Sequence, residues 1–220
     1  MKVIVSWSSG KDSAWMIHVL RARSDVHVGA LLTTINRDAN RVAMHGVRLD
    51  LVEAQAAALE LPLWQVPIPS PCSNEEYERA MSAVVRRAVA EGFTHCAFAD
   101  LFLEDVRRYR EERLEGSGLV PMFPLFGVDT SALARQMIGA GLGARITCVD
   151  PRAIDRRFAG REYDAALLAE LPPSADPCGE RGEFHTFAYR GPMFPCPIPI
   201  DTGQTVERDG FVFTDLLRST

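Results

Sequence analysis

Six consecutive residues near the start of the chain have the composition of a phosphate-binding loop. The segment SSGKDS, residues 8–13, directly follows the apolar run KVIVSW and opens a helical pattern. Backbone N–H groups in a loop of small residues at a helix start converge on an anion, and the helix dipole strengthens the attraction. The sequence therefore predicts a phosphate site where the first strand ends.

Each residue type in this loop has a use in phosphate chemistry. Gly10 allows the backbone to approach closely, and Lys11 adds a positive charge. Asp12 can assist Mg²⁺ or cap the loop. Hydroxyl donors come from three serines, Ser8, Ser9 and Ser13. The loop is not a Walker A motif, because Val5 stands where that motif needs glycine and Asp12 where it needs Ser or Thr. A Ser/Gly turn that merely caps a helix is the alternative interpretation.

A second group of reactive side chains lies near the C-terminus, in the segment GERGEFHT. Glu180 and Glu183 are three residues apart among glycines, and His185 follows them. Such carboxylates can bind Mg²⁺, hold an ammonium ion or act as a general base. A neutral His can accept a proton from an attacking amine. An acidic turn whose charges are only solvated is the alternative.

Other polar residues carry weaker signals. Asp100 ends an apolar strand pattern at the edge where the loop opens, although it would equally suit a cap of the next helix. Arg107 and Glu111 are four residues apart, which is the spacing of a surface ion pair. By themselves, Asn36 and His45 indicate only a capped loop after the second strand.

The loop SSGKDS resembles the SGGxDS pyrophosphate loop of the ATP pyrophosphatase superfamily, with Ser9 in place of the first glycine. Within that superfamily, the chain resembles the diphthine–ammonia ligase family over nearly its whole length. The resemblance implies a HUP-like, adenine nucleotide alpha hydrolase-like fold and cleavage of ATP between its α- and β-phosphates.

Three further segments carry the resemblance. NRDANRVAMHGV resembles the family's nucleotide-pocket segment and matches at Asn36, Met44 and His45. FADLFLEDVRRYRE resembles the family's GDI…D-R-E stretch and matches at Asp100, Asp105, Arg107 and Glu111, with Ala99 replacing a glycine. DPCGERGEFHTFAYRGPMF resembles the C-terminal signature GExGE[FY]xT and matches at Gly179, Glu180, Gly182, Glu183 and Thr186.

The resemblance also implies roles for these residues. Asn36, His45 and Asp100 would join residues 8–13 in binding ATP, with Mg²⁺ at Asp12. The acceptor would contact Asp105, Arg107, Glu111, Glu180, Gly182, Glu183 and Thr186. Catalysis would rest on Lys11, Asp12, Glu183 and His185.

The predicted reaction is an ATP-dependent ligation of a carboxylate to ammonia. The carboxylate attacks the α-phosphorus to form an acyl-adenylate, and ammonia then displaces AMP. Fixed N–H donors and Lys11 would stabilise the negative charge that develops on the leaving pyrophosphate. No segment resembles a glutaminase, so free ammonia is the expected nitrogen donor.

The acceptor is less determined than the ATP chemistry. Eukaryotic and archaeal ligases of this family typically read EYET in the last motif, whereas this chain reads EFHT, with Phe184 and His185. That form resembles bacterial members, whose hosts are not expected to make diphthamide, and some such relatives are linked to corrinoid salvage. The acceptor is therefore either a modified protein side chain or a corrinoid-like metabolite.

Two further functions share this kind of loop or scaffold. A sulfur-transferring nucleotide modifier generally needs cysteine pairs and a basic RNA-binding surface, but this chain has no C-x-x-C motif and a net charge of −5. A non-catalytic ATP sensor would bind ATP without releasing pyrophosphate and would not need the acidic C-terminal loop.

The elements that must position these residues alternate along the chain. Short apolar runs such as KVIVSW, VHVGALLTTI, LWQVPI, THCAFAD and LVPMFPLF read as buried parallel strands. Helical patterns over 11–23, 47–61 and 74–91 separate them, the last one capped by Ser73 and stopped by Gly92. We predict an α/β fold with a doubly wound parallel sheet at residues 1–125. A smaller α+β region at 126–220 follows, with short strand-like pieces in its tail.

Composition sets outer limits. The chain of 220 residues, 47% hydrophobic and 24% charged, is typical of a globular protein. Its acidic balance argues against a nucleic-acid or membrane-surface partner, and no apolar window is long enough to span a membrane. The five scattered cysteines suit a reducing cytoplasm, so we expect a cytoplasmic location. A homodimer remains an option.

Overall fold

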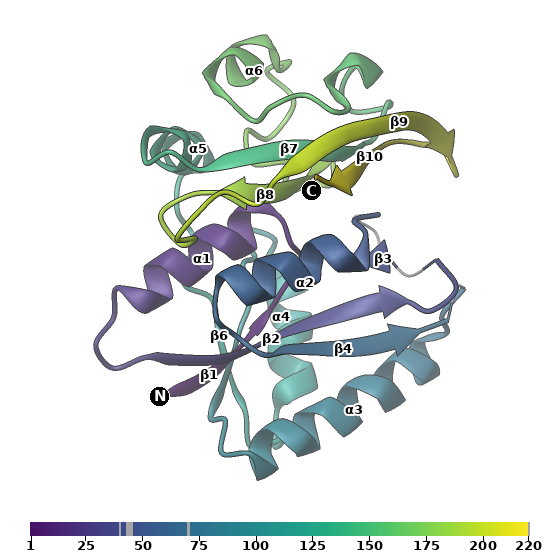
Figure 1. Cartoon of the computed structure of the whole chain (residues 1–220). Coiled ribbons are helices and arrows are strands. Elements are labelled where there is room, and N and C mark those ends of the chain that lie inside the picture. Colours follow the sequence, from purple (N-terminus) through teal and green to yellow (C-terminus); the bar gives the residue numbers. More distant parts are fainter. Residues whose placement is uncertain (40, 43–45, 70, 220) are drawn as a thin grey trace.

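Two β-sheets organise the molecule (Figure 1). The computed structural model describes residues 1–39, 41–42, 46–69 and 71–219. Within them, a mainly parallel sheet of six strands comes from the first part of the chain, and an antiparallel sheet of four strands from the last part.

The first sheet has the strand order that places a ligand site at its centre. Its parallel strands are β1 (Lys2–Ser6), β2 (His27–Asn36), β4 (Leu63–Ile68), β5 (His95–Ala97) and β6 (Val120–Met122). They lie in the order β4-β2-β1-β5-β6, and the short β3 (Arg41–Val42) pairs antiparallel with the end of β2. The order reverses between β1 and β5, where ligands of open α/β sheets bind. The predicted doubly wound sheet is confirmed.

Helices cover both faces of this sheet. They are α1 (Lys11–Arg21), α2 (Leu49–Ala58), α3 (Asn74–Ala90) and α4 (Glu104–Leu114). In Figure 1, α1 and α2 lie between the two sheets, whereas α3 and α4 cover the opposite face of the parallel sheet. The helix that begins at the predicted phosphate loop, α1, therefore lies between the N-terminal parallel sheet and the C-terminal antiparallel sheet.

The caps of α3 are those that its sequence predicts. The Ser73 hydroxyl accepts a hydrogen bond from the Glu76 N–H, and the Glu76 carboxylate accepts one from the Ser73 N–H. This capping box satisfies two N–H groups that a helix start otherwise leaves unpaired. Gly92 follows the helix with φ of 78°, which glycine adopts without strain.

The prediction for α2 is wrong in its length. The helix spans ten residues, not 47–61, and its buried side chains are Leu51, Val52, Gln55 and Ala56. Ala54 and Ala58 are half-buried and pack against the same core cluster as Leu51. A glutamine, Gln55, is fully buried beside these apolar side chains.

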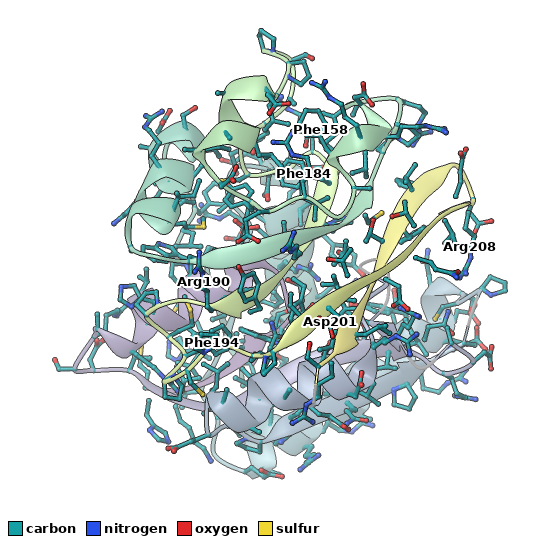
Figure 2. All side chains as sticks on the ribbon, turned by 45° about the horizontal axis from the view of Figure 1, so that its top comes forward. Phe158, Phe184, Arg190, Phe194, Asp201 and Arg208 are labelled. Carbon is teal, nitrogen blue, oxygen red and sulfur yellow. The ribbon has the colours of Figure 1, made fainter. Side chains whose placement is uncertain are left out.

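The second sheet consists of β7 (Gly143–Val149), β8 (Phe184–Arg190), β9 (Ile200–Arg208) and β10 (Phe211–Arg218), in the order β8-β7-β10-β9. Helices α5 (Thr130–Gly139) and α6 (Ala165–Glu170) and the short 3₁₀ helix η1 (Arg156–Phe158) complete the region. The expectation of short strand-like pieces is wrong for β9 and β10, which form a long hairpin. Figure 2 shows Arg208 near its outer end and Asp201 on β9 nearer the body of the molecule.

A single hydrophobic cluster joins the two sheets through α1 and α2. It includes Val3 of β1, Ile17 of α1, Leu51 of α2, Ile146 of β7 and Phe187 of β8. A smaller cluster, which includes Trp64 and Phe93, lies on the other face of the parallel sheet beneath α3. The two regions of the chain therefore share a core.

Candidate functional site

The loop of residues 8–13 connects β1 to α1 and is shaped by its own side chains. The Ser8 and Ser13 hydroxyl oxygens are 3.1 Å apart, and the Gly10 N–H donates to the Ser8 oxygen at 3.3 Å. The Ser13 hydroxyl donates to the Gly10 carbonyl at 3.0 Å. These short-range bonds give the loop a fixed conformation beside the point where the strand order reverses.

Ser9 has an unusual backbone and an unpaired hydroxyl. Its φ is 69°, a left-handed value that favours glycine, and the resembled pyrophosphate loop has glycine at this position. The side chain is fully buried, and its Oγ has no hydrogen-bond partner. Ser9 does not line the cavity at the loop, although its carbonyl accepts a hydrogen bond from the Ala188 N–H at 2.9 Å.

Gln55 is a positioning residue that sequence reasoning missed. Its Nε2 donates to the Ser9 carbonyl at 2.9 Å and to the Ala188 carbonyl at 2.7 Å, and its Oε1 accepts from the Trp7 Nε1 at 3.0 Å. The side chain thus ties α2 to the phosphate loop and to β8. A glutamine four residues after Leu51 on an otherwise apolar helix face was the available signal.

The C-terminal motif lies directly on the phosphate loop. The Lys11 N–H donates to the Thr186 Oγ1 at 3.1 Å, so a residue 175 positions away caps α1. A Cβ atom on Gly10 would lie 3.2 Å from the Thr186 carbonyl oxygen, closer than most side chains tolerate. The close approach favours glycine at position 10, and it brings the two predicted motifs into contact.

The Lys11 side chain points into the seam between the two regions. Only 2% of it is exposed, and its Nζ donates to the Asp12 Oδ2 at 2.8 Å and to the Cys178 carbonyl. The rings of Tyr163 and Phe184 lie 5.2 and 5.4 Å away. Burial lowers the pKa of Lys11, but the charge and hydrogen bond of Asp12, together with Cys178 and Asp176, outweigh burial and raise it. Lys11 therefore carries a buried positive charge just behind the loop.

A cavity of about 250 Å³ opens at the loop and gathers most of the predicted site residues. Its lining includes Ser8, Gly10, Lys11, Asp12, Ser13, Asp100, Glu180, Gly182, His185 and Thr186. Four of these come from the C-terminal motif, and Asp100 comes from the segment after β5. The cavity therefore requires both ends of the chain.

Three carboxyl groups give this cavity an acidic wall. The Asp12 Oδ1 and Asp100 Oδ2 atoms are buried without a hydrogen-bond partner. Burial raises the pKa of Asp100, although Arg110 opposes this effect. Glu180 accepts a hydrogen bond from the Leu101 N–H at 2.7 Å. Burial, with the charges of Asp12 and Asp100 adding to it, raises the pKa of Glu180 to about 7. The wall can hold a cation or exchange a proton near neutral pH.

Glu183 and His185 occupy different places in the C-terminal motif. The Glu183 carboxylate is buried and accepts hydrogen bonds from the Asp176 and Arg181 N–H groups at 2.8 and 3.0 Å. It fixes the loop that carries Glu180 and does not line the cavity. His185 does line it and is half-buried.

Four predicted site residues lie away from the loop cavity. The Asn36 side chain accepts hydrogen bonds from the N–H groups of residues 38 and 39 at 3.0 and 3.1 Å, and lines a separate cavity of about 370 Å³ beside the β9–β10 hairpin. Asp105 is exposed on α4, and Arg107 pairs with Glu111 at 2.9 Å on the same helix. Predicted residues Met44 and His45 lie outside the described part of the chain.

A larger, mostly apolar cavity of about 520 Å³ adjoins the loop cavity. It lies between the parallel sheet and helices α3 and α4. The two cavities share the residues Ser6, Ser8, Phe98 and Arg110. Together they form a space with a polar end at the loop and an apolar end under α3, which suits a phosphorylated ligand that has a flat apolar group.

The described residues contain no group of three or more His, Cys, Asp or Glu side chains placed to hold a metal ion by themselves. None of their helices has the length and hydrophobicity needed to cross a membrane.

Comparisons with known proteins cover nearly the whole chain. A model of the diphthamide synthase N-terminal domain matches residues 1–116, and a model of the diphthamide synthase C-terminal domain matches residues 129–215. The diphthine–ammonia ligase of Rattus norvegicus is 25% identical over 94% of this chain and 85% of its own length. That of Danio rerio is 28% identical over 100% of this chain and 95% of its own.

Proposed function

The chain belongs to the diphthamide synthase family, and from that premise we propose that it is an ATP-dependent ligase. It joins a carboxylate to ammonia and releases AMP and pyrophosphate. The relatives that bear the name diphthine–ammonia ligase support the ligase activity. The proposed reaction steps are based on the residues that line the loop cavity.

One observation carries the proposal. Thr186 and Glu180 of the C-terminal motif lie in the same cavity as Ser8, Asp12 and Ser13 of the phosphate loop. A protein that only bound nucleotide would need the loop alone. A ligase must also place an acceptor and a proton-transfer group beside the phosphates, and the C-terminal motif supplies residues for both.

The two adjoining cavities suggest how ATP binds. The β- and γ-phosphates would lie on residues 8–13, where N–H groups and the α1 dipole favour anions. The nucleoside would fill the apolar cavity beneath α3. The unpaired oxygens of Asp12 and Asp100 fit a Mg²⁺ ion carried by the nucleotide. Mg²⁺ bound there would neutralise phosphate charge.

The first step is adenylation. An oxygen of the acceptor carboxylate attacks the α-phosphorus, the bond from this phosphorus to the bridging oxygen breaks, and pyrophosphate leaves with the electron pair. The loop N–H groups stabilise the charge that develops on the leaving group. The Lys11 side chain is buried beside these N–H groups. Its ammonium charge also stabilises the negative charge of the leaving pyrophosphate.

The second step is amidation. Ammonia attacks the acyl carbon and the carbon–oxygen bond to AMP breaks, so AMP leaves and an amide remains. Ammonium must lose a proton before it can attack, and we assign this proton to Glu180, which lines the cavity and whose pKa burial raises to about 7. His185 lines the same cavity as a second proton acceptor. Glu183 holds the loop that positions Glu180.

The relatives' names indicate one candidate for the acceptor, and the C-terminal motif of this chain favours keeping a second. Those names point to diphthine, a modified histidine of a protein. The residues Phe184 and His185, in place of the EYET form, keep a corrinoid-like carboxylate as the alternative acceptor.

Phosphorus NMR on the purified protein tests the proposal. Mg²⁺-ATP and ammonium are supplied alone, with diphthine-bearing elongation factor, and with corrinoid carboxylates. We expect AMP and pyrophosphate to appear with one acceptor class and to fall at least a hundredfold in Ser13→Ala. Formation of ADP and phosphate would overturn the adenylation step, and intact ATP with every acceptor would favour a sensor.

A further inference from the structure

Arg110 of α4 lies where three cavities meet. It lines the loop cavity, the apolar cavity beneath α3, and a groove of about 440 Å³ between α3 and α4. Its guanidinium carbon is 4.9 Å from the centroid of the Phe98 ring, which lines the same three spaces. A positive charge therefore stands at the passage between the predicted phosphate and nucleoside positions.

The hydrogen bonds of Arg110 are incomplete. Its Nε is buried without a hydrogen-bond partner, and so is the nearby Asp100 Oδ2. The two atoms form an ion pair at 3.7 Å, but this distance is too long for a hydrogen bond. On the same helix, Arg107 reaches its carboxylate partner Glu111 at 2.9 Å. A buried, unpaired guanidinium donor is costly unless a ligand completes its hydrogen bonds.

The order of groups in ATP identifies that ligand. A nucleotide that extends from the apolar cavity to the loop must pass the junction formed by Ser6, Ser8, Phe98 and Arg110. The α-phosphate is the group between the nucleoside and the terminal phosphates. In a nucleotide bound in this way, the α-phosphate would lie at the junction, beside the guanidinium.

We propose that Arg110 binds the α-phosphate of the nucleotide, an inference that rests on the proposed function. A guanidinium offers several N–H donors in one plane and suits two phosphate oxygens at once. Contact with this group would hold the phosphorus that the acceptor attacks. It would also retain the acyl-adenylate after pyrophosphate has left.

Binding of adenosine, AMP and ATP tests the assignment. Ligand-observed NMR titrations give the dissociation constants for the wild-type chain, Arg110→Met, Arg110→Lys and the control Arg108→Met, an exposed arginine on the same helix. We expect Arg110→Met to weaken AMP binding at least tenfold and to leave adenosine binding within twofold. Arg110→Lys should weaken AMP binding about threefold, because lysine keeps the charge but loses the planar pair of donors. Arg108→Met should change neither.

The possible outcomes separate this inference from the function on which it rests. If Arg110→Met changed the AMP and adenosine constants by the same factor, or changed neither, the α-phosphate assignment would be overturned while the nucleotide site stood. If the wild-type chain bound none of the three ligands, the nucleotide site and this inference would fall together. Thermal melting confirms that each variant is folded, and Arg110→Lys decides the question if Arg110→Met is not.

Discussion

Ser9 holds a backbone conformation that costs a non-glycine residue free energy. Its φ of 69° and its buried, unpaired hydroxyl both destabilise the folded chain. Ser9→Gly relieves the strain and removes the hydroxyl, although it adds backbone entropy to the unfolded state. We expect a net gain of about 1 kcal/mol in the free energy of unfolding, measured by urea denaturation without ligand.

Ser9→Ala is the matched comparison for this change. It removes the hydroxyl but keeps the Cβ atom, so it should recover only part of the gain. A Ser9→Gly variant less stable than the wild type would show that the hydroxyl makes a bond worth more than the strain.

Glu180 should make stability depend on pH in an unusual direction. Its pKa is about 7 in the folded chain, against an ordinary value of 4.5. Between these two values the folded state holds a proton that the unfolded state has released, so this group lowers stability as pH rises. Glu180→Gln imitates the protonated form. The variant should therefore gain stability over the wild type from pH 4.5 to 7 and keep a constant advantage above that.

Urea denaturation at a series of pH values measures this difference. Glu112→Gln, which removes an exposed carboxyl on α4, serves as the baseline. A difference between Glu180→Gln and wild type that did not vary with pH would show that Glu180 is ionised throughout, and would remove it as a proton acceptor near pH 7.

At the scale of single residues, the sequence predicted the residues of the loop and its motif partner, but not the residues that contact the loop from other helices. The loop residues and Thr186 stood out by type and motif, and the structure brings them together. Gln55 and Arg110 had no motif to mark them. Their importance comes from what they contact across 46 or more residues of chain, or from which cavities they border, and neither property is visible in spacing.

At the scale of the elements, α2 is linked to the loop of residues 8–13 and to β8 by the hydrogen bonds of Gln55. Gln55→Leu keeps the size of the side chain but leaves the Trp7 Nε1 without its partner and removes the hydrogen bonds to the Ser9 and Ala188 carbonyls in a buried region, where the Ser9 carbonyl keeps only the bond from the Ala188 N–H. We expect a loss of about 3 kcal/mol in the free energy of unfolding, because each unpaired buried group costs roughly 1–3 kcal/mol.

Glu53→Ala on the same helix is the control for this variant. Its carboxylate is exposed and accepts a hydrogen bond from Gln65, so the change should stay within about 0.5 kcal/mol. If Gln55→Leu cost no more than Glu53→Ala, the loop would not depend on α2.

The elements themselves were predictable where local rules decide them. The capping box at Ser73 and the glycine after α3 fixed both ends of that helix. The length of the β9–β10 hairpin was not predictable, since β9 is mostly exposed and lacks the apolar alternation that marks a strand. The strand β9 forms because it pairs antiparallel with β10, and this pairing has no signal in the β9 sequence.

At the scale of the whole molecule, the shared core predicts that both regions unfold together. One cluster joins the parallel sheet, α1, α2 and the antiparallel sheet, so neither sheet keeps all of its apolar contacts alone. Differential scanning calorimetry should show a single transition whose calorimetric and van't Hoff enthalpies agree. Two separated transitions, or a stable isolated fragment of residues 1–125, would mean that the N-terminal region folds independently.

The contact between Lys11 and Thr186 has a consequence for how the protein is made. A ribosome that adds roughly 5–20 residues per second needs about 10–35 seconds to deliver Thr186 after Lys11. During that interval the loop has been synthesised, but α1 lacks its cap and the Lys11 ammonium lacks the Cys178 carbonyl. A nascent or truncated chain therefore lacks these contacts, so the proposed nucleotide cleavage would require the finished protein.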